Sequence, residues 1–206
     1  LGFVETLQGP ARNDPVARDR FLAIMGEQAR RMSRLVDDLL SLSRIEQSSH
    51  LQPTTIVDLA AIAGDVLDAL APTITESETQ IVYHAEKPVL VRGNRDELVR
   101  VAENLIENAM KYGASDKPLE VTVGEHGGNG VLIVRDHGPG IGPEHLPRLT
   151  ERFYRVDAGE SRAKGGTGLG LAIVKHILAR HRGRLTIDSD RSQGATFSAI
   201  LPLGKA

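Results

Sequence analysis

The side chains best suited to bind a ligand lie in the stretch NLIENAMKYG, residues 104–113. Asn104 and Asn108 stand one helical turn apart and Lys111 follows three residues later, so all three share one face of a predicted helix. Asparagine is a poor mid-helix residue, because its amide competes for backbone hydrogen bonds. Amide oxygens are suitable hard ligands for Mg²⁺, and a lysine can contact a phosphate as a point charge. This face predicts a Mg²⁺–phosphate site, with a solvated helix surface as the alternative.

A second stretch, DHGPGI at residues 136–141, follows the predicted buried strand VLIV. An ionised Asp136 only accepts hydrogen bonds, which suits an exocyclic amine such as the adenine amino group. Gly138 and Gly140 have no Cβ, so a planar base can approach the backbone there. A tight turn after a strand also satisfies this pattern, and the stretch alone leaves both interpretations open.

A third stretch, GGTGLGLAI at residues 165–173, is rich in glycine and leads into an apolar run. The residues before it have no strand character, which excludes a dinucleotide-binding fingerprint. Leu171 and Ala172 stand where a Walker-type loop needs Lys and then Ser or Thr. Two interpretations remain: an anion-binding segment at a helix N-terminus, and a hinge.

The first 47 residues predict a helical hairpin. A short helix ends at Gly9, and after a polar turn a long helix runs for about thirty residues without an interior proline. Its apolar stripe, which includes Met32, Val36 and Leu39, is too extensive for one short neighbour to cover. We therefore expect dimerisation into a helical bundle. Packing of the long helix on the following domain is the alternative.

Helices and strands alternate after a predicted linker at residues 48–55. Several of the strands form hairpins rather than strand-helix-strand units, which favours an α+β sandwich with one mixed sheet and helices on one face. The predicted helices are residues 58–72, 94–113 and 167–183, and the predicted strands lie within residues 79–85, 88–93, 119–136 and 184–202.

Composition limits the classes of partner. A net charge of -2 predicts no strong attraction to nucleic acid or anionic lipid, and with 3% aromatic residues no binding through stacked bases is expected. The absence of cysteine excludes disulfides and thiolate zinc sites. No run approaches the roughly 18 apolar residues that a membrane span needs.

In their order and spacing, the three stretches resemble the sensor histidine kinases and the wider ATPases with the Bergerat nucleotide fold. NLIENAMKY resembles the N box of that family, DHGPGI its first glycine box with His137 where Asn is usual, and GGTGLGLAI its second glycine box. ERFYRVD at residues 151–157 resembles the F box, and GATF at residues 194–197 the late Gly-x-Thr-Phe segment. The chain looks most similar to the phosphate-regulon sensor subgroup.

This resemblance implies two domains, a dimerisation and histidine phosphotransfer hairpin over residues 1–50 and a catalytic ATP-binding domain over residues 51–206. It implies ATP and Mg²⁺ as ligands, with Asn108 holding the metal and Phe153 docking a lid formed by residues from about 143 to 167. The implied catalytic residues are Asn104, Asn108 and Lys111. The implied ATP-binding residues are Asn104, Asn108, Lys111, Tyr112, Asp136, Gly138, Gly140, Ile141, Arg162, Lys164, Gly166, Thr167, Gly168, Leu169, Gly170 and Thr196, the last acting on adenine through water.

The resemblance also implies phosphorylation of a histidine and relay to an aspartate in the receiver domain of a response regulator. We expect a homodimer formed through the hairpin, no nucleic-acid partner, and a location on the cytoplasmic side of an inner membrane that is reached only through segments outside this chain. The family's phosphoacceptor stands in a His-Glu-x-x-x-Pro box, and none of the seven histidines does. We therefore expect a truncated hairpin, lacking this box, and a chain that binds ATP without autophosphorylation.

Three alternative functions share the same nucleotide fold. The long hairpin argues against a serine kinase or anti-sigma factor, which has little need of a dimerising helix pair. Asn104 argues against a hydrolytic ATPase, because an amide cannot act as the general base that activates water. A non-catalytic ATP-binding module is the third alternative, and the presence of Asn108 and Asp136 weighs against it.

Overall fold

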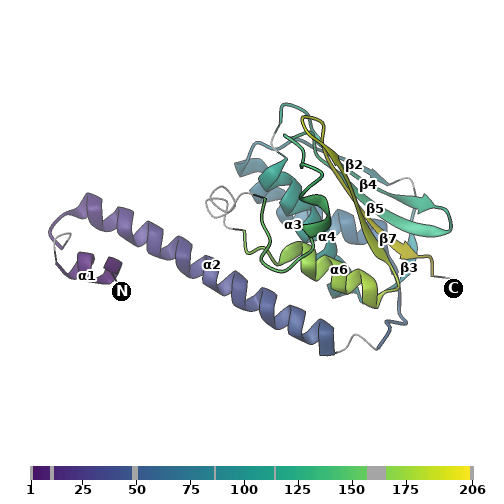
Figure 1. Ribbon diagram of the computed structural model, residues 1–206, viewed down its shortest axis with the longest axis horizontal. Helices are drawn as coiled ribbons and strands as arrows, with labels where there is room; N and C mark the ends of the chain where they lie inside the picture. Colours follow the sequence, from purple (N-terminus) through teal and green to yellow (C-terminus); the bar gives the residue numbers. More distant parts are fainter. Residues whose placement is uncertain are drawn as a thin grey trace.

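The computed structural model describes residues 2–9, 12–47, 51–85, 87–113, 115–156 and 166–204, and it shows a long helix beside an α/β body (Figure 1). Helix α1 (Gly2–Gln8) and helix α2 (Pro15–Gln47) form the predicted hairpin. Asp14 Oδ1 accepts a hydrogen bond from Ala17 N at 3.0 Å, and the proline at the first helical position needs no amide partner, so α2 begins there. Within the described residues, no helix has the length and apolar character needed to cross a membrane.

The body is a five-stranded mixed sheet with three helices on one face, as Figure 1 shows. The strand order is β2-β4-β5-β7-β6, in which β2 pairs with β4 in parallel and the other neighbours are antiparallel. The predicted fold class is confirmed. The strands are β2 (Ile81–Ala85), β4 (Leu119–His126), β5 (Asn129–Arg135), β6 (Arg184–Asp190) and β7 (Gly194–Pro202), and the helices are α3 (Leu59–Glu76), α4 (Arg95–Tyr112) and α6 (Gly170–Arg180).

Two local features differ from the sequence prediction. Strand β1 (Ile56–Asp58) pairs with β3 (Leu90–Arg92) in a separate two-stranded sheet, although no strand was expected before α3. Three residues carry little periodic signal, and their backbone partner lies more than thirty residues away in sequence. Helix α3 also continues past Pro72, where an end was expected. Pro72 and Asp68 are exposed, so the Asp68 carbonyl group, which loses its helical partner, can bind water.

Helix α2 packs on the body through its C-terminal half. Leu42 and Ile45 are buried in the hydrophobic core, and α2 packs against α6 there. Met32, Val36 and Leu39 of the predicted stripe remain exposed. One end of the long helix therefore packs on the following domain, as the alternative prediction had it, while the stripe on which the dimerisation prediction rests is exposed.

The buried face of α4 fixes the rotation of this helix, and Leu105 is fully buried on that face. We predict that Leu105→Ala lowers the free energy of unfolding by about 2 to 5 kcal/mol, because it removes buried methyl groups and leaves a cavity. Leu51→Ala removes the same atoms from a side chain that is 57% exposed, and a change within about 0.5 kcal/mol is expected. Urea unfolding followed by circular dichroism measures both. Equal effects of the two substitutions would contradict the buried orientation.

Candidate functional site

A cavity of about 770 Å³ opens between α2, α4, the turn after β5 and the glycine segment, residues 166–170, that leads into α6. Its volume is in the range of small-molecule sites. Most of the residues predicted to bind ATP line this cavity, although they come from distant parts of the chain. They are Asn104, Asn108, Lys111, Tyr112, Asp136, Gly140, Ile141, Gly166, Thr167, Gly168 and Gly170.

Asp136 lies directly after β5 and is held by the backbone on both sides. Its Oδ1 accepts hydrogen bonds from Gly138 N at 3.0 Å and from Ala195 N at 3.2 Å, while Asp136 N donates to Ala195 O at 2.9 Å. The residue is only 6% exposed. Burial raises the pKa of this carboxyl group, and the two backbone hydrogen bonds oppose that effect. A fixed acceptor in a low-dielectric wall suits an amine donor.

Glycines surround Asp136 because side chains would not fit. A Cβ on Gly113 would lie 2.2 Å from Asp136 Cβ, and a Cβ on Gly194 would lie 2.0 Å from Asp136 O. Gly138 does not line the cavity, and a Cβ there would lie 2.7 Å from Gly113 Cα. Gly138 supports Asp136 by donating its backbone N–H.

Helix α4 turns its polar face to the cavity. Asn94 begins the helix by accepting a hydrogen bond from Glu97 N at 3.1 Å, and the residues opposite the amides are buried in the core. Asn104 Nδ2 donates to Arg100 O at 2.7 Å, whereas the Asn108 amide makes no hydrogen bond to any described residue. Lys111 forms an ion pair with Glu107. Asn108 thus offers the amide oxygen that a ligand or metal ion can use.

The glycine segment packs tightly on the residues after β5 and on α4. Gly168 adopts a φ of +74°, and its carbonyl accepts a hydrogen bond from Phe153 N at 2.8 Å. A Cβ on Gly170 would lie 2.4 Å from Asn104 Oδ1, so a larger residue at the start of α6 would displace the Asn104 amide. Phe153 was expected to dock the lid on the core; the residue is 56% exposed, and its backbone N–H makes the contact with Gly168.

Some predicted ATP-binding residues do not reach the cavity. Thr196 is a correction: Ala195 and Phe197 line the cavity, and the alternation of side chains along β7 places Thr196 on the opposite face. Leu169 is fully buried in the core instead. Arg162 and Lys164 lie outside the described residues.

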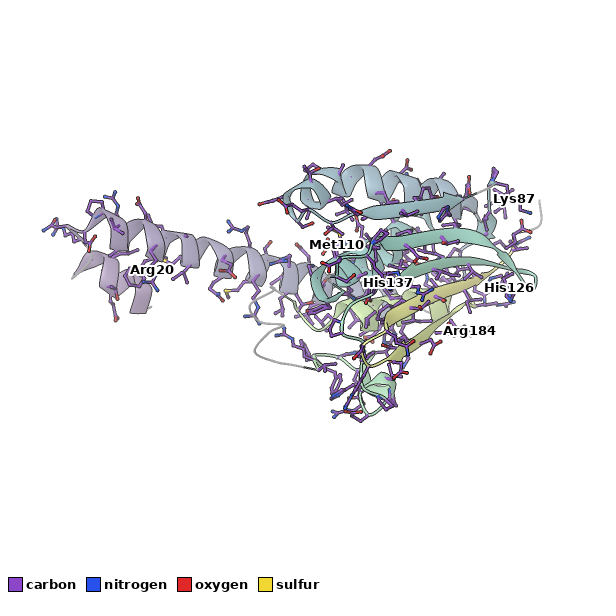
Figure 2. The ribbon with its side chains drawn as sticks, turned by 90° about the horizontal axis from the view of Figure 1, so that it is seen from above. Arg20, Lys87, Met110, His126, His137 and Arg184 are labelled. Atoms are coloured by element: carbon purple, nitrogen blue, oxygen red, sulfur yellow. The ribbon has the colours of Figure 1, made fainter. Side chains whose placement is uncertain are left out.

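His137, which stands where the family usually has Asn, pairs with β4 instead of lining the cavity. Its Nε2 lies 2.8 Å from Glu120 Oε1. Figure 2 labels this residue over the sheet, far from the free end of α2 that Arg20 marks.

The cavity also includes residues that the sequence did not single out for binding. Arg100 continues the face of the two amides one turn earlier, as helical periodicity predicts, although no binding role was predicted for it. The contribution of α2 had no local signal, because it depends on how this helix packs against the body. The cavity residues from α2 are Arg34, Asp37, Asp38, Leu40, Ser41 and Arg44.

The donor set fits a metal that reaches the site together with a phosphate ligand. Within the described ranges there is no group of three or more His, Cys, Asp or Glu side chains that could hold an ion. Mg²⁺ takes few protein ligands and keeps phosphate oxygens and water. Asn108 lines this cavity with a side-chain amide that accepts no hydrogen bond from a described residue, so its Oδ1 could hold the ion.

Two family models match the chain. The model of histidine kinase-, DNA gyrase B- and HSP90-like ATPases matches residues 93–205, and the model of the His Kinase A (phospho-acceptor) domain matches residues 1–48. A phospho-acceptor domain is therefore represented by the hairpin. The expectation of a chain unable to autophosphorylate gains no support from this match.

The chain is similar to several curated proteins and solved structures. It is 38% identical to the phosphate regulon sensor protein PhoR of Pseudomonas aeruginosa over 96% of this chain and 44% of that protein. It is 34% identical to the sensor-like histidine kinase SenX3 of Mycolicibacterium smegmatis over 92% of this chain and 50% of that protein. The chain thus spans about half the length of these relatives. The structure of the Acinetobacter baumannii histidine kinase AdeS matches with a TM-score of 0.75 and 25% identity, over 99% of this chain and 93% of that one.

The fit of Gly113 against Asp136 generates a prediction about packing. Gly113→Ala is expected to lower the free energy of unfolding by about 1 to 3 kcal/mol, because the new methyl group must displace the carboxyl group. Gly124→Ala is the matched control, since a Cβ there meets nothing within 4 Å. Chemical denaturation of both variants measures the difference. A Gly113→Ala variant as stable as Gly124→Ala would show that Asp136 is not confined in this way.

The raised pKa of Asp136 generates a prediction about pH. Because burial disfavours the ionised form, Asp136 is expected to reduce stability as pH rises above the pKa of an unfolded aspartate, with the loss levelling off above the folded-state pKa. The stability of the protein relative to its Asp136→Asn variant should therefore fall with rising pH. Denaturation of both proteins across the acidic range measures this slope, and a difference that rises with pH would contradict it.

Proposed function

The chain belongs to the family of sensor histidine kinases of two-component systems, and from this membership we propose that its cavity binds Mg-ATP for transfer of the γ-phosphoryl group to a histidine. The observation that carries the proposal is the position of the Asp136 carboxylate and the Asn108 amide on the walls of one cavity. They are a hydrogen-bond acceptor and a hard oxygen ligand, which a purine amine and a metal-bound phosphate require.

We propose that adenine binds at the Asp136 end of the cavity. The carboxylate accepts the hydrogen bond of the exocyclic amine, while Gly140 and Ile141 line the wall beside it. Gly140 has a φ of +70°, and a Cβ there would lie 2.0 Å from Asp190 O, so its backbone is kept bare. The base is therefore surrounded by backbone and apolar groups and makes its polar contact with Asp136. This arrangement favours specificity for the exocyclic amine rather than high affinity.

The triphosphate is proposed to run along α4 toward the glycine segment. Asn108 holds Mg²⁺, Asn104 supports the same end of the site, and Lys111 contacts phosphate oxygen. Bound Mg²⁺ neutralises charge on the phosphates during transfer. The chain positions the nucleotide, and the backbone N–H groups at the start of α6 supply partial positive charge. No side chain here acts as a covalent nucleophile; the attacking atom is an imidazole nitrogen of the phospho-acceptor histidine.

The hairpin is proposed to serve dimerisation and relay. The exposed stripe of Met32, Val36 and Leu39 is a surface on which the same helix of a second copy can pack, because an apolar face of this size is otherwise left in water. The receiver domain of a response regulator is the proposed acceptor from the phosphohistidine. We place this activity on the cytoplasmic side of an inner membrane, with any anchor outside this chain.

The same-fold alternatives are not favoured. A hydrolytic ATPase needs a base near the γ-phosphate, and Asn104 cannot accept a proton. A serine kinase or anti-sigma factor leaves the match of residues 1–48 to the phospho-acceptor model without a role. Acid-labile label from γ-labelled ATP on the histidine of a phospho-acceptor hairpin supplied in trans supports the kinase. Acid-stable phosphoserine, or rapid release of free phosphate, supports the alternatives.

The nucleotide site is tested by calorimetric titration with Mg-ATP. Asp136→Asn and Asn108→Ala are each expected to lower the affinity about 10- to 100-fold, because each removes a charge-assisted or metal-linked contact. In EDTA the Asn108→Ala variant should bind ATP as the unmodified chain does, since the lost contact runs through the metal. Asp188→Asn and Asn129→Ala make the same chemical changes on β6 and β5, outside the cavity. The proposal fails if these controls lose as much affinity as the site variants.

A further inference from the structure

A carboxylate of α2 bridges two elements of the cavity. Asp38 Oδ1 accepts a hydrogen bond from Arg100 Nη2 of α4 at 2.8 Å, and Asp38 Oδ2 accepts one from Thr167 Oγ1 of the glycine segment at 2.7 Å. The Asp38 side chain is 17% exposed, so solvent and salt screen this contact less than a surface ion pair. Both oxygens of one anion are thus occupied by donors from the two walls of the nucleotide cavity.

Arg100 and Thr167 are both placed to receive a phosphate. Arg100, Asn104 and Asn108 line the cavity at successive turns of α4, leading away from Tyr112 and Asp136. A nucleotide whose base contacts Asp136 therefore extends its phosphates toward the Arg100 end of the helix. A guanidinium and a hydroxyl that converge on two oxygens of a carboxylate present the donors that phosphate oxygens accept.

We propose that Asp38 and a phosphate group of the nucleotide compete for Arg100 and Thr167, so that Arg100 is a further phosphate-binding residue and Asp38 sets the affinity from α2. This inference rests on the proposed Mg-ATP site, and it adds Arg100 and Asp38, to which the family resemblance gave no role, to Thr167, which the resemblance assigned to ATP binding. Two anions cannot share these donors without repulsion, so phosphate binding releases Asp38. By thermodynamic linkage the two effects are equal in size. Nucleotide binding weakens the contact between α2 and the body by the same factor as Asp38 weakens nucleotide binding.

The structure supplies a control for this competition. Asp37, the adjacent carboxylate on α2, also lines the cavity but is exposed, and the described residues form no hydrogen bond or ion pair with it. Asp37→Asn therefore removes the same charge from the same region without freeing Arg100 or Thr167. The change in Mg-ATP affinity caused by Asp37→Asn measures how far the loss of one negative charge alone strengthens binding of an anionic ligand. This change must be subtracted from the change caused by Asp38→Asn.

The experiment measures affinities for Mg-ATP and for adenosine by titration calorimetry on the full chain, with circular dichroism as the test of folding. Asp38→Asn is expected to tighten Mg-ATP binding about 5-fold, near the lower end of typical coupling between sites. The gain should exceed that of Asp37→Asn. Adenosine carries no phosphate, so its affinity should match that of the unmodified chain in both variants.

A double-substitution cycle isolates the shared donor. Arg100→Gln is expected to weaken Mg-ATP binding about 5-fold or more in the Asp38→Asn background, and by less in the unmodified chain, where the arginine is already engaged. In the Arg100→Gln background, the gain from Asp38→Asn beyond that of Asp37→Asn should shrink to the part that the release of Thr167 supplies. If Asp38→Asn does not fold, Asp38→Ser carries the same comparison.

The outcomes separate this inference from the function on which it rests. If the unmodified chain binds neither adenosine nor Mg-ATP, the proposed nucleotide site is wrong. If it binds both, the competition is overturned when Asp38→Asn gains no more than Asp37→Asn. It is also overturned when Asp38→Asn keeps its full gain without Arg100, or when adenosine affinity rises as much as Mg-ATP affinity.

Discussion

The confinement of Asp136 between backbone segments determines the rest of the site. Its carboxylate ties the end of β5 to the start of β7, and the positions around it hold glycine because a Cβ would overlap with Asp136 at Gly113 and at Gly194. The end of α4 can approach the end of β5 this closely because Gly113 has no Cβ. The buried Asp136 carboxylate thus fixes where the end of α4 meets the turn after β5.

The direction of the amides follows from packing on the other side of α4. Leu98 and Leu105 are fully buried, which fixes the rotation of the helix and turns Asn108 to the cavity. The start of α4 is fixed separately: His181 at the end of α6 accepts a hydrogen bond from Asn94 N at 3.0 Å through Nε2. Burial lowers the pKa of His181, which keeps this acceptor neutral.

Residues whose role depends on local spacing could be predicted from the sequence. The amide face of α4, the acceptor after β5 and the start of α6 follow from helical period, strand ends and glycine patterns, and the structure brings them to one cavity. Thr196 was predicted wrongly because the choice of face along β7 depends on strand register, which a motif does not contain. Strand β1 was missed for a related reason, since it pairs with the distant β3.

The contribution of α2 shows most clearly what local sequence cannot provide. Asp38, Leu42 and Ile45 follow the spacing i, i+4 and i+7, so they lie on one face of the helix. Burial of Leu42 and Ile45 in the core therefore carries the Asp38 carboxylate to the donors on α4 and the glycine segment. Apolar docking and charge pairing act through the same helical face. A shift of α2 that disturbs one must disturb the other, and this connects the position of the hairpin to the chemistry of the cavity.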